Sequence, residues 1–360
     1  MAPPHLPSTL VTISAPLSII GSFSIIYVIS RSTDKLNTTL HRLLVGLCIG
    51  DLLTSIALAF TKVIINFEGF PVVNNQAACG AQGFLIVLGG IVSPFYNCGL
   101  CVYYLCVIKW NYSNAKMTKN VEPFLHAIPW LWGLFSAIFV VATNNVNLGF
   151  GYCSINNAPA PLECTADASA DCSGGINAVK LRWALQGGPL FAIFFAICIQ
   201  MAVIYLHVWR LERKMRNAGY RSTNAARAGR RRGMPEANMI VGRQTAAQAN
   251  SGRGVLRQSV SNSRKTLNQA LAYVGAYFIT YFLVFLSGFM FLATGKYNDI
   301  IVLIALFLYP LQGKCLSVPA TVLAKPAARL VYQCSIRSLT VLIFLQRLPQ
   351  LHSLHILQSY

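Results

Sequence analysis

The sequence predicts an all-α integral membrane protein, a bundle of seven membrane-spanning helices with its N-terminus outside and its C-terminus inside. Hydrophobic residues make up 55% of the 360 residues and charged residues only 11%, whereas a soluble domain carries about 25% charged residues. Seven apolar stretches are long enough to cross a bilayer. They cover residues 9–30, 39–64, 82–108, 123–143, 183–209, 267–293 and 299–324.

The distribution of basic residues predicts the orientation of this bundle. The formal net charge is +19, and 14 of the 29 Lys and Arg residues lie between Arg210 and Lys265. The odd-numbered connectors between spans are basic and the even-numbered ones are not, and basic connectors mark the cytoplasmic side. Topology therefore explains the charge, and we expect the basic loop to contact anionic lipid headgroups rather than nucleic acid.

The spans divide the chain into regions of different character. Residues 1–8 form a short extracellular N-terminus without the basic region of a cleavable signal peptide. Residues 9–324 form the membrane domain, and the Arg-, Ala- and Ser-rich residues 217–264 form a disordered loop inserted in it. Residues 325–360 form an apolar, proline-interrupted cytoplasmic tail. A frame or intron error in the gene would explain this tail equally well.

The third span lies within an unusual stretch, Cys79–Trp110, which carries no charge before Lys109. Within it Asn97, Cys101 and Tyr104 follow at helical spacing and therefore share one face. Polar groups at membrane depth are costly unless they face protein or water. We therefore expect this face to look into the bundle and the helix to be surrounded by others.

Asp51 lies near the middle of the second span. A carboxylate there costs several kcal/mol unless it has a partner or a shifted pKa. It either has a function or holds the bundle together by hydrogen bonds, and its cost favours function. In the sixth span, Tyr273, Tyr277 and Tyr281 form a stripe at helical spacing, which favours packing over ligand binding.

Two further groups of side chains lie in the connectors. Four cysteines are on the outer side, where disulfides persist, and four cysteines allow three pairings. They are Cys79, Cys153, Cys164 and Cys172. In the basic loop, three serines follow Arg257, as in sites for basophilic kinases, namely Ser259, Ser261 and Ser263. Regulatory phosphorylation and a solvated loop that touches anionic lipid are equally favoured there.

Short pieces in the expected order and spacing carry a resemblance to a known family. They are Gly21–Arg31, His41–Leu44, Asp51 with Ser55, Cys79–Phe84, Phe95–Asn97, Tyr103–Trp110, Gly151–Ile155 and Tyr309–Gly313. Through them, about residues 10–313 resemble a rhodopsin-like seven-transmembrane G-protein-coupled receptor, of the divergent kind found in unicellular eukaryotes and related to cyclic-AMP receptors.

The resemblance implies roles for single residues. It implies the disulfides Cys79–Cys153 and Cys164–Cys172. It implies a buried switch that binds sodium or water at Asp51, formed by Asp51, Ser55, Asn97, Tyr309 and Pro310. It implies a G-protein face, formed by Arg42, Lys109, Trp110, Arg210, Arg213, Arg264 and Lys265. The chain would be a plasma-membrane receptor without a cofactor or enzymatic activity, and its partners would be an extracellular ligand and a heterotrimeric G protein.

Three features depart from the family, and one of them is a sixth span without the tryptophan-proline hinge pair. The base of the third span has Tyr103–Leu105 in place of an acidic-Arg-aromatic triplet. Lys314 follows the Tyr309-Pro310 pair, and it either pairs with Asp51 or extends to the interface.

Alternative functions are a transporter or channel and a retinal-binding photoreceptor. The absence of repeated halves counts against transport. Lys314 as a retinal attachment point lies on the cytoplasmic side of where opsin-like receptors carry that lysine. The spans contain no paired Asp, His cluster or Gly-x-Ser-x-Gly, which argues against an intramembrane enzyme.

Overall fold

The structure, a computed structural model, describes residues 5–32, 35–66, 72–73, 76–149, 152–156, 175–231, 281–290 and 299–308, together with residues 275, 277, 278 and 294. Among these residues, five helical stretches are long and apolar enough to cross a membrane. They belong to α1 (His5–Arg31), α2 (Thr39–Ala59), α4 (Gln76–Lys109), α6 (Glu122–Ala142) with the short helix before it, and α8 (Gly188–Arg231) with the turn before it.

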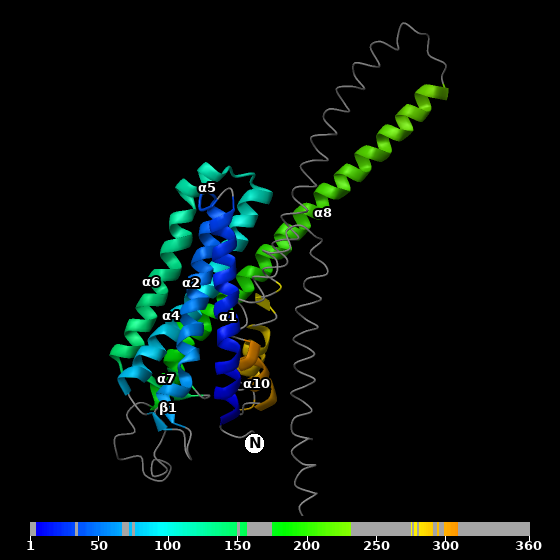
Figure 1. The fold of residues 1–360 in the computed structure, drawn as a ribbon. Coiled ribbons are helices and arrows are strands. Elements are labelled where there is room, and N and C mark those ends of the chain that lie inside the picture. The colour runs from blue at the N-terminus through cyan, green and yellow to red at the C-terminus, as the bar shows by residue number, and fades with distance from the viewer. Residues whose placement is uncertain are drawn as a thin grey trace, which may run out of the picture.

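The predicted helical bundle is confirmed, and its first five spans are present as helices. Of the sixth and seventh spans, the structure describes the apolar helical segment Tyr281–Met290 and α10 (Asp299–Leu308). Figure 1 shows α10 beside α1 and the N-terminus at the end opposite to α5. Residues 309–324, and with them Tyr309, Pro310 and Lys314, lie outside the described residues.

Helix α4 is the central element of the bundle (Figure 1). In its most apolar stretch 78% of the residues are buried, compared with 28% in each of the two following spans. Asn97, Cys101 and Tyr104 are all buried, with at most 1% of each residue exposed. The expectation that this face looks into the bundle is therefore confirmed.

Helices α2 and α4 approach each other closely because glycines lie between them. A Cβ atom at Gly89 would come within 2.5 Å of the carbonyl oxygen of Gly50. A Cβ atom at Gly46 would lie 2.7 Å from the hydroxyl of Tyr96, so the Tyr96 ring takes the place of that side chain. Small residues at such contacts let helices pack through their backbones.

Two short antiparallel strand pairs cover the outer end of the bundle. After α3 (Thr61–Ile64), β1 (Ile65–Asn66) pairs with β2 (Val72–Val73), and β3 (Val146–Gly149) pairs with β4 (Tyr152–Ile155). The sequence analysis treated these residues only as connectors between spans. The pair β1–β2 contains Ile65, Val72 and Val73, β-branched residues that favour strands. Both pairs are too short to change the helical fold class.

A disulfide joins Cys79 at the start of α4 to Cys153 in β4, with the two Cα atoms 5.4 Å apart. The first of the two implied pairings is therefore confirmed in the structure. The second, between Cys164 and Cys172, lies outside the described residues and remains a prediction.

Two helices shape the cytoplasmic end, and the second of them differs from the expectation. The third connector forms a helix, α5 (Asn114–Asn120), whose first turn is capped by the Ser113 hydroxyl, which accepts from the amide of Lys116. Helix α8 continues to Arg231, beyond the point where a disordered loop was expected to begin. Ala and Arg residues are strong helix formers and account for this extension. Residues 232–264 lie outside the described part of the chain.

The described part of the aromatic stripe of the sixth span packs as predicted, and Tyr273 lies outside the described residues. Tyr277 and Tyr281 are 0% and 1% exposed, and their rings stack 4.5 Å apart. Phe285 continues the stripe and contacts Phe191 and Phe194 of α8, with ring centroids 4.7 and 4.9 Å apart. These contacts hold the segment Tyr281–Met290 against α8.

Removing the disulfide should release the hairpin β3–β4 from the start of α4. Its cysteines are 74 residues apart. Closing a loop of that length stabilises the folded state by about 4 kcal/mol, because it lowers the entropy of the unfolded chain. We expect Cys79→Ser and Cys153→Ser each to abolish surface expression and to lower the melting temperature of solubilised protein. Cys198→Ser, at a half-exposed free thiol of α8, is the control. Normal expression of both disulfide variants would contradict the assignment.

Candidate functional site

A cavity of about 430 Å³ opens at the outer end of the bundle. Its walls come from β4, α7 (Gly175–Arg182), η2 (Trp183–Gly187), α8, the segment Tyr281–Met290 and α10. Residues that supply rings, hydroxyls and a charge to it include Tyr152, Ser154, Arg182, Trp183, Phe191 and Tyr281. A cavity of this size suits a small organic molecule.

The strand β4 is held in place by Gln82 of α4 as well as by the disulfide. The Gln82 side chain donates to the carbonyl of Ala57 and to the hydroxyl of Thr61, each at 2.9 Å. Its oxygen accepts from the amide of Cys153 at 3.0 Å. Gln82 is buried, so these three bonds are protected from water and fix one wall of the cavity relative to α2 and α4.

A π-helical turn, η2, forms the opposite wall. This wider turn ends at Gly187, directly before Gly188 and Pro189. A Cβ atom at Gly187 would come within 2.6 Å of the Trp183 ring, so glycine makes room for the indole. The indole stacks on Phe191 with ring centroids 5.5 Å apart. Such π-turns occur frequently at functional sites.

The carboxylate of Asp51 is buried between α2 and α4. One oxygen accepts a short hydrogen bond of 2.5 Å from the hydroxyl of Ser93. The other oxygen has no hydrogen-bond partner among the described residues. A buried carboxylate oxygen is costly without a partner, and an oxygen pair of this kind is a ligand for a hard cation or for water.

The residues predicted to act with Asp51 are partly described. Ser55, one turn further along α2, is 2% exposed. The Asn97 amide, one turn beyond Ser93 on α4, donates to the Ser93 carbonyl at 3.3 Å. The structure therefore links Asp51 to Asn97 through Ser93, a residue that the sequence analysis did not select. Whether Tyr309 and Pro310 join them remains a prediction.

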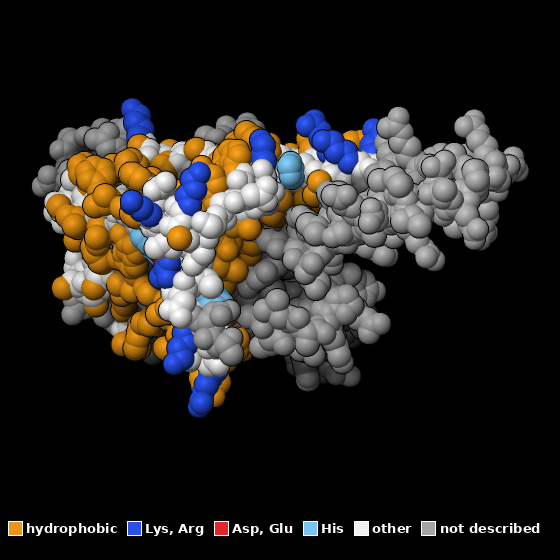
Figure 2. Space-filling model, turned by 90° about the horizontal axis from the view of Figure 1, so that it is seen from above, with side chains coloured by type: hydrophobic (Ala, Val, Ile, Leu, Met, Phe, Trp, Pro, Cys, Tyr) orange, Lys and Arg blue, Asp and Glu red, His pale blue; other side chains and the backbone are white. Residues whose placement is uncertain are grey.

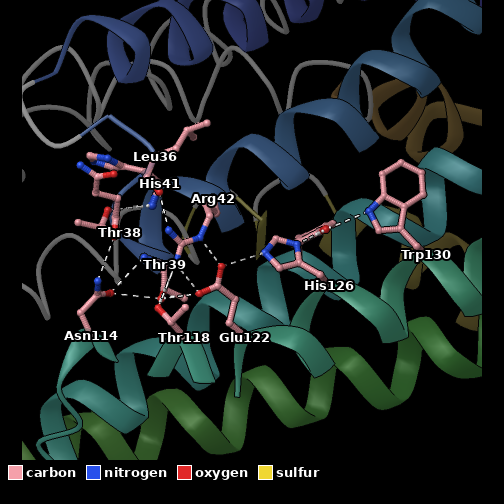
Figure 3. Close-up of polar contacts among 12 residues, drawn as sticks. Leu36, Thr38, Thr39, His41, Arg42, Asn114, Thr118, Glu122, His126 and Trp130 are labelled. Carbon is pink, nitrogen blue, oxygen red and sulfur yellow. Dashed lines mark hydrogen bonds and ion pairs between the residues drawn. The ribbon is translucent and has the colours of Figure 1, made fainter. Parts of the chain in front are cut away.

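A cluster of polar side chains joins three helices at the cytoplasmic end (Figure 3). Arg42 of α2 forms a two-pronged ion pair with Glu122 at the start of α6, with Nη2 2.6 Å from Oε2. The Thr39 hydroxyl donates to the same carboxylate at 2.8 Å, and Arg42 donates to Thr118 of α5 at 3.1 Å. The Asn114 side-chain oxygen accepts from the amide of Thr39. The cluster therefore docks α5 against α2.

The cluster continues into the bundle along α6. His126 lies one turn after Glu122, with its Nε2 atom 3.6 Å from the carboxylate. Its Nδ1 atom is 2.7 Å from the hydroxyl of Tyr96 in α4, and the Trp130 indole donates to that hydroxyl at 3.0 Å (Figure 3). This row of contacts joins α6 to the central helix at the place where Tyr96 also fills the gap beside Gly46.

The cytoplasmic end carries a basic surface. Figure 2 views the molecule from this end and shows Lys and Arg side chains over it, with no acidic side chain of the described residues visible. Lys109, Trp110, Arg210 and Arg213 are exposed there. Lys109 lies over the Trp110 ring, 5.7 Å from its centroid. Of the predicted G-protein face, Arg42 is engaged with Glu122, and Arg264 and Lys265 lie outside the described residues.

Comparison with known families agrees with this architecture. The model of the family described as 7 transmembrane receptor (rhodopsin family) matches residues 21–312. The chain belongs to the rhodopsin family of seven-transmembrane receptors. No curated protein matches the chain.

Membership of the rhodopsin family confirms the coarser part of the resemblance. Rhodopsin-family proteins are multi-pass membrane receptors, so the chain is a membrane receptor by family. The relation to cyclic-AMP receptors and the plasma-membrane location are finer statements that the family match leaves as predictions.

Sequence reasoning missed the Arg42–Glu122 pair and the cavity. Glu68 and Glu122 are the two acidic residues between Asp51 and Glu163. A signal for the pair was therefore present, because Glu122 starts an apolar span beside a basic connector. Charges at the ends of spans seek partners. The cavity had no comparable signal, because its walls come from segments far apart in the chain.

Breaking the Arg42–Glu122 pair should destabilise the cytoplasmic end. The Glu122 side chain is 9% exposed, so Arg42→Ala leaves a nearly buried carboxylate without its cation and should cost about 2 to 3 kcal/mol. The melting temperature of solubilised protein should fall accordingly, and the double variant Arg42→Met with Glu122→Met should recover much of the loss. Lys119→Ala, at an exposed cation of α5, is the control. Equal melting temperatures for the Arg42 and Lys119 variants would show that the pair contributes nothing.

Proposed function

We propose that the chain is a G-protein-coupled receptor of the plasma membrane, in which a ligand in the outer cavity changes helix packing and a heterotrimeric G protein reads the change. The observation that carries this proposal is an outer cavity with room for a small ligand inside a rhodopsin-family bundle. A ligand shifts such a bundle only by binding one arrangement of the helices more tightly than another.

The coupling surface is the basic cytoplasmic end. Lys109 is the last residue of α4, Trp110 follows it, and Arg210 and Arg213 lie on α8. All four are exposed, and both helices extend to the outer half of the bundle. Cationic and aromatic side chains are enriched where proteins bind acidic partners. We propose that the G protein binds here, next to the basic loop with its serine cluster and its contacts to anionic lipid. The finer kinship, to divergent cyclic-AMP receptors of unicellular eukaryotes, belongs to the same proposal.

Asp51 is proposed as the buried switch. Its Ser93 bond joins α2 to α4, and its second oxygen has no partner among the described residues. A sodium ion or water at that oxygen would offset the cost of the buried charge. Because such a ligand would bind one packing of the helices better than another, it would bias the bundle toward one state.

The purified full chain in lipid nanodiscs should accelerate nucleotide exchange on at least one heterotrimeric G protein. Reversing the charge at the coupling surface with Lys109→Glu and Arg213→Glu should slow exchange about tenfold or more, because like charges across an interface weaken binding. Lys62→Glu reverses an exposed cation in α3, away from that surface, and should leave exchange unchanged. The proposal is wrong if no G protein responds, or if the Lys62 variant is affected as much as the others.

Replacing the carboxylate should alter signalling more than folding. We expect Asp51→Asn to change the basal exchange rate and to remove its dependence on sodium, measured by replacing sodium with choline at constant ionic strength. Cys48→Ala changes a buried side chain one turn earlier on α2 and controls for altered packing. If Asp51→Asn lowers only the yield of folded protein, the carboxylate serves structure alone.

A further inference from the structure

His126 lies between two helices near the cytoplasmic end, and both of its ring nitrogens face a polar partner (Figure 3). Nδ1 is 2.7 Å from the hydroxyl of Tyr96 in α4, and Nε2 is 3.6 Å from the carboxylate of Glu122 one turn earlier on α6. The imidazole is 32% exposed and lies about 6 Å along α6 from the residue at which the helix begins. Solvent protons can therefore reach it from the cytoplasmic side.

The indole of Trp130 fixes the direction of the bond between His126 and Tyr96. An indole N–H only donates, so the Tyr96 oxygen accepts from it at 3.0 Å, and the hydroxyl hydrogen is left to donate to Nδ1. The ring hydrogen of neutral His126 then lies on Nε2, toward the negative carboxylate of Glu122. The other tautomer would turn the Nε2 lone pair toward that carboxylate and leave the Tyr96 hydrogen without an acceptor. The neutral form with hydrogen on Nε2 therefore suits every group in this row.

Protonation of His126 reverses this bond. An imidazolium carries hydrogen on both nitrogens, so Nδ1 no longer accepts and has to donate to the Tyr96 oxygen instead. The Tyr96 hydroxyl hydrogen then has no acceptor among the side chains that the structure describes, and this residue is only 1% exposed. A buried donor without an acceptor is costly. One proton therefore changes how α6 and α4 are held together.

The charges that face His126 offset each other. Glu122 lies on its own helix and Arg42 on α2, and these two side chains form an ion pair. Helix α4 presents Tyr96, and α5 presents the uncharged Thr118 to the ion pair. Within the described part of the chain, these are the titratable or charged side chains that face the imidazole. No single charge fixes His126 in one form, and histidine is the side chain whose charge changes near neutral pH.

We propose that His126 is a proton-binding site that couples the pH at the cytoplasmic end to the packing of α6 against the central helix α4. The proton breaks the bond in which Tyr96 donates to Nδ1 and forms the reverse bond. It also gives Glu122 a second cation, at the oxygen to which Arg42 already donates. Because the Tyr96 ring takes the place of a side chain at Gly46, the change occurs where α2 and α4 meet. This inference needs no ligand and no G protein.

Nitrogen NMR of the full chain in neutral detergent, with its six histidines labelled with ¹⁵N, tests the site directly. Comparison with His126→Asn identifies the signals of His126. At pH 8 they should show hydrogen on Nε2 and none on Nδ1, and between pH 8 and pH 5 they should change to those of an imidazolium. The inference is wrong if neutral His126 carries its hydrogen on Nδ1, or if the ring keeps one form over this range.

The coupling to packing is tested by the removal of one hydroxyl. Tyr96→Phe deletes the donor to Nδ1 and keeps the ring beside Gly46. It should lower the melting temperature by about 2 °C more at pH 8 than at pH 5.5, because the donor already lacks an acceptor in the protonated form. Tyr103→Phe removes the hydroxyl of a half-buried tyrosine two turns later on α4. This control should have the same effect at both pH values.

A second background shows whether His126 is the group that titrates. In His126→Asn, the effect of Tyr96→Phe should be the same at pH 8 and at pH 5.5. In His207→Asn, at a half-exposed histidine of α8, the difference seen in the wild type should persist. Equal effects at both pH values in the wild type, or a difference that survives in His126→Asn, would overturn the inference. If Tyr96→Phe does not fold, the NMR titration decides alone.

Discussion

The close contact between α2 and α4 is the constraint on which the rest of the structure depends. In a bilayer the lipid tails are as apolar as the helix surfaces, so helices associate through tight packing and interhelical hydrogen bonds. Both are present here. Gly46 and Gly89 leave no side chain where the two helices meet, and the hydroxyl of Ser93 donates to Asp51 across the same contact. Larger residues at the glycines would separate the helices and remove the partner of the carboxylate.

Because α4 is fixed in this way, it sets the position of both functional ends. At the outer end it holds β4 through Cys79 and Gln82, and at the inner end it holds α6 through Tyr96. One wall of the cavity is thus fixed to the bundle centre. The opposite wall belongs to α7, η2 and α8, and α8 continues without a break to the exposed Arg210 and Arg213. A ligand that moves this wall would therefore also move the helix that carries part of the proposed coupling surface.

The sequence predicted what local composition determines. Hydropathy located the spans, the charge of the connectors predicted their orientation, and polar spacing identified the buried face of α4. The Cys79–Cys153 pairing required a resemblance to a family, because spacing alone allowed three pairings. The Arg42–Glu122 pair could not be found in this way, because its members are 80 residues apart and meet only once α2 and α6 are packed. The pair β3–β4 likewise depends on tertiary contacts, because Gln82 and the disulfide hold β4 to α4.

The structure shows which contacts lie at the cytoplasmic end of α4, where the acidic-Arg-aromatic triplet is absent. The base of α4 has Tyr104, which is fully buried, and its end carries Lys109 over Trp110 instead of an ion pair. The ion pair at this level is formed by α2 and α6, on the side of the bundle that holds α5. It is reinforced by Thr39 and Thr118, so it ties together helices that α4 already holds. The printed contacts of that network come from α2, α5 and α6, whereas the aromatic contacts that hold α8, at Phe191 and Phe194, lie near its outer end.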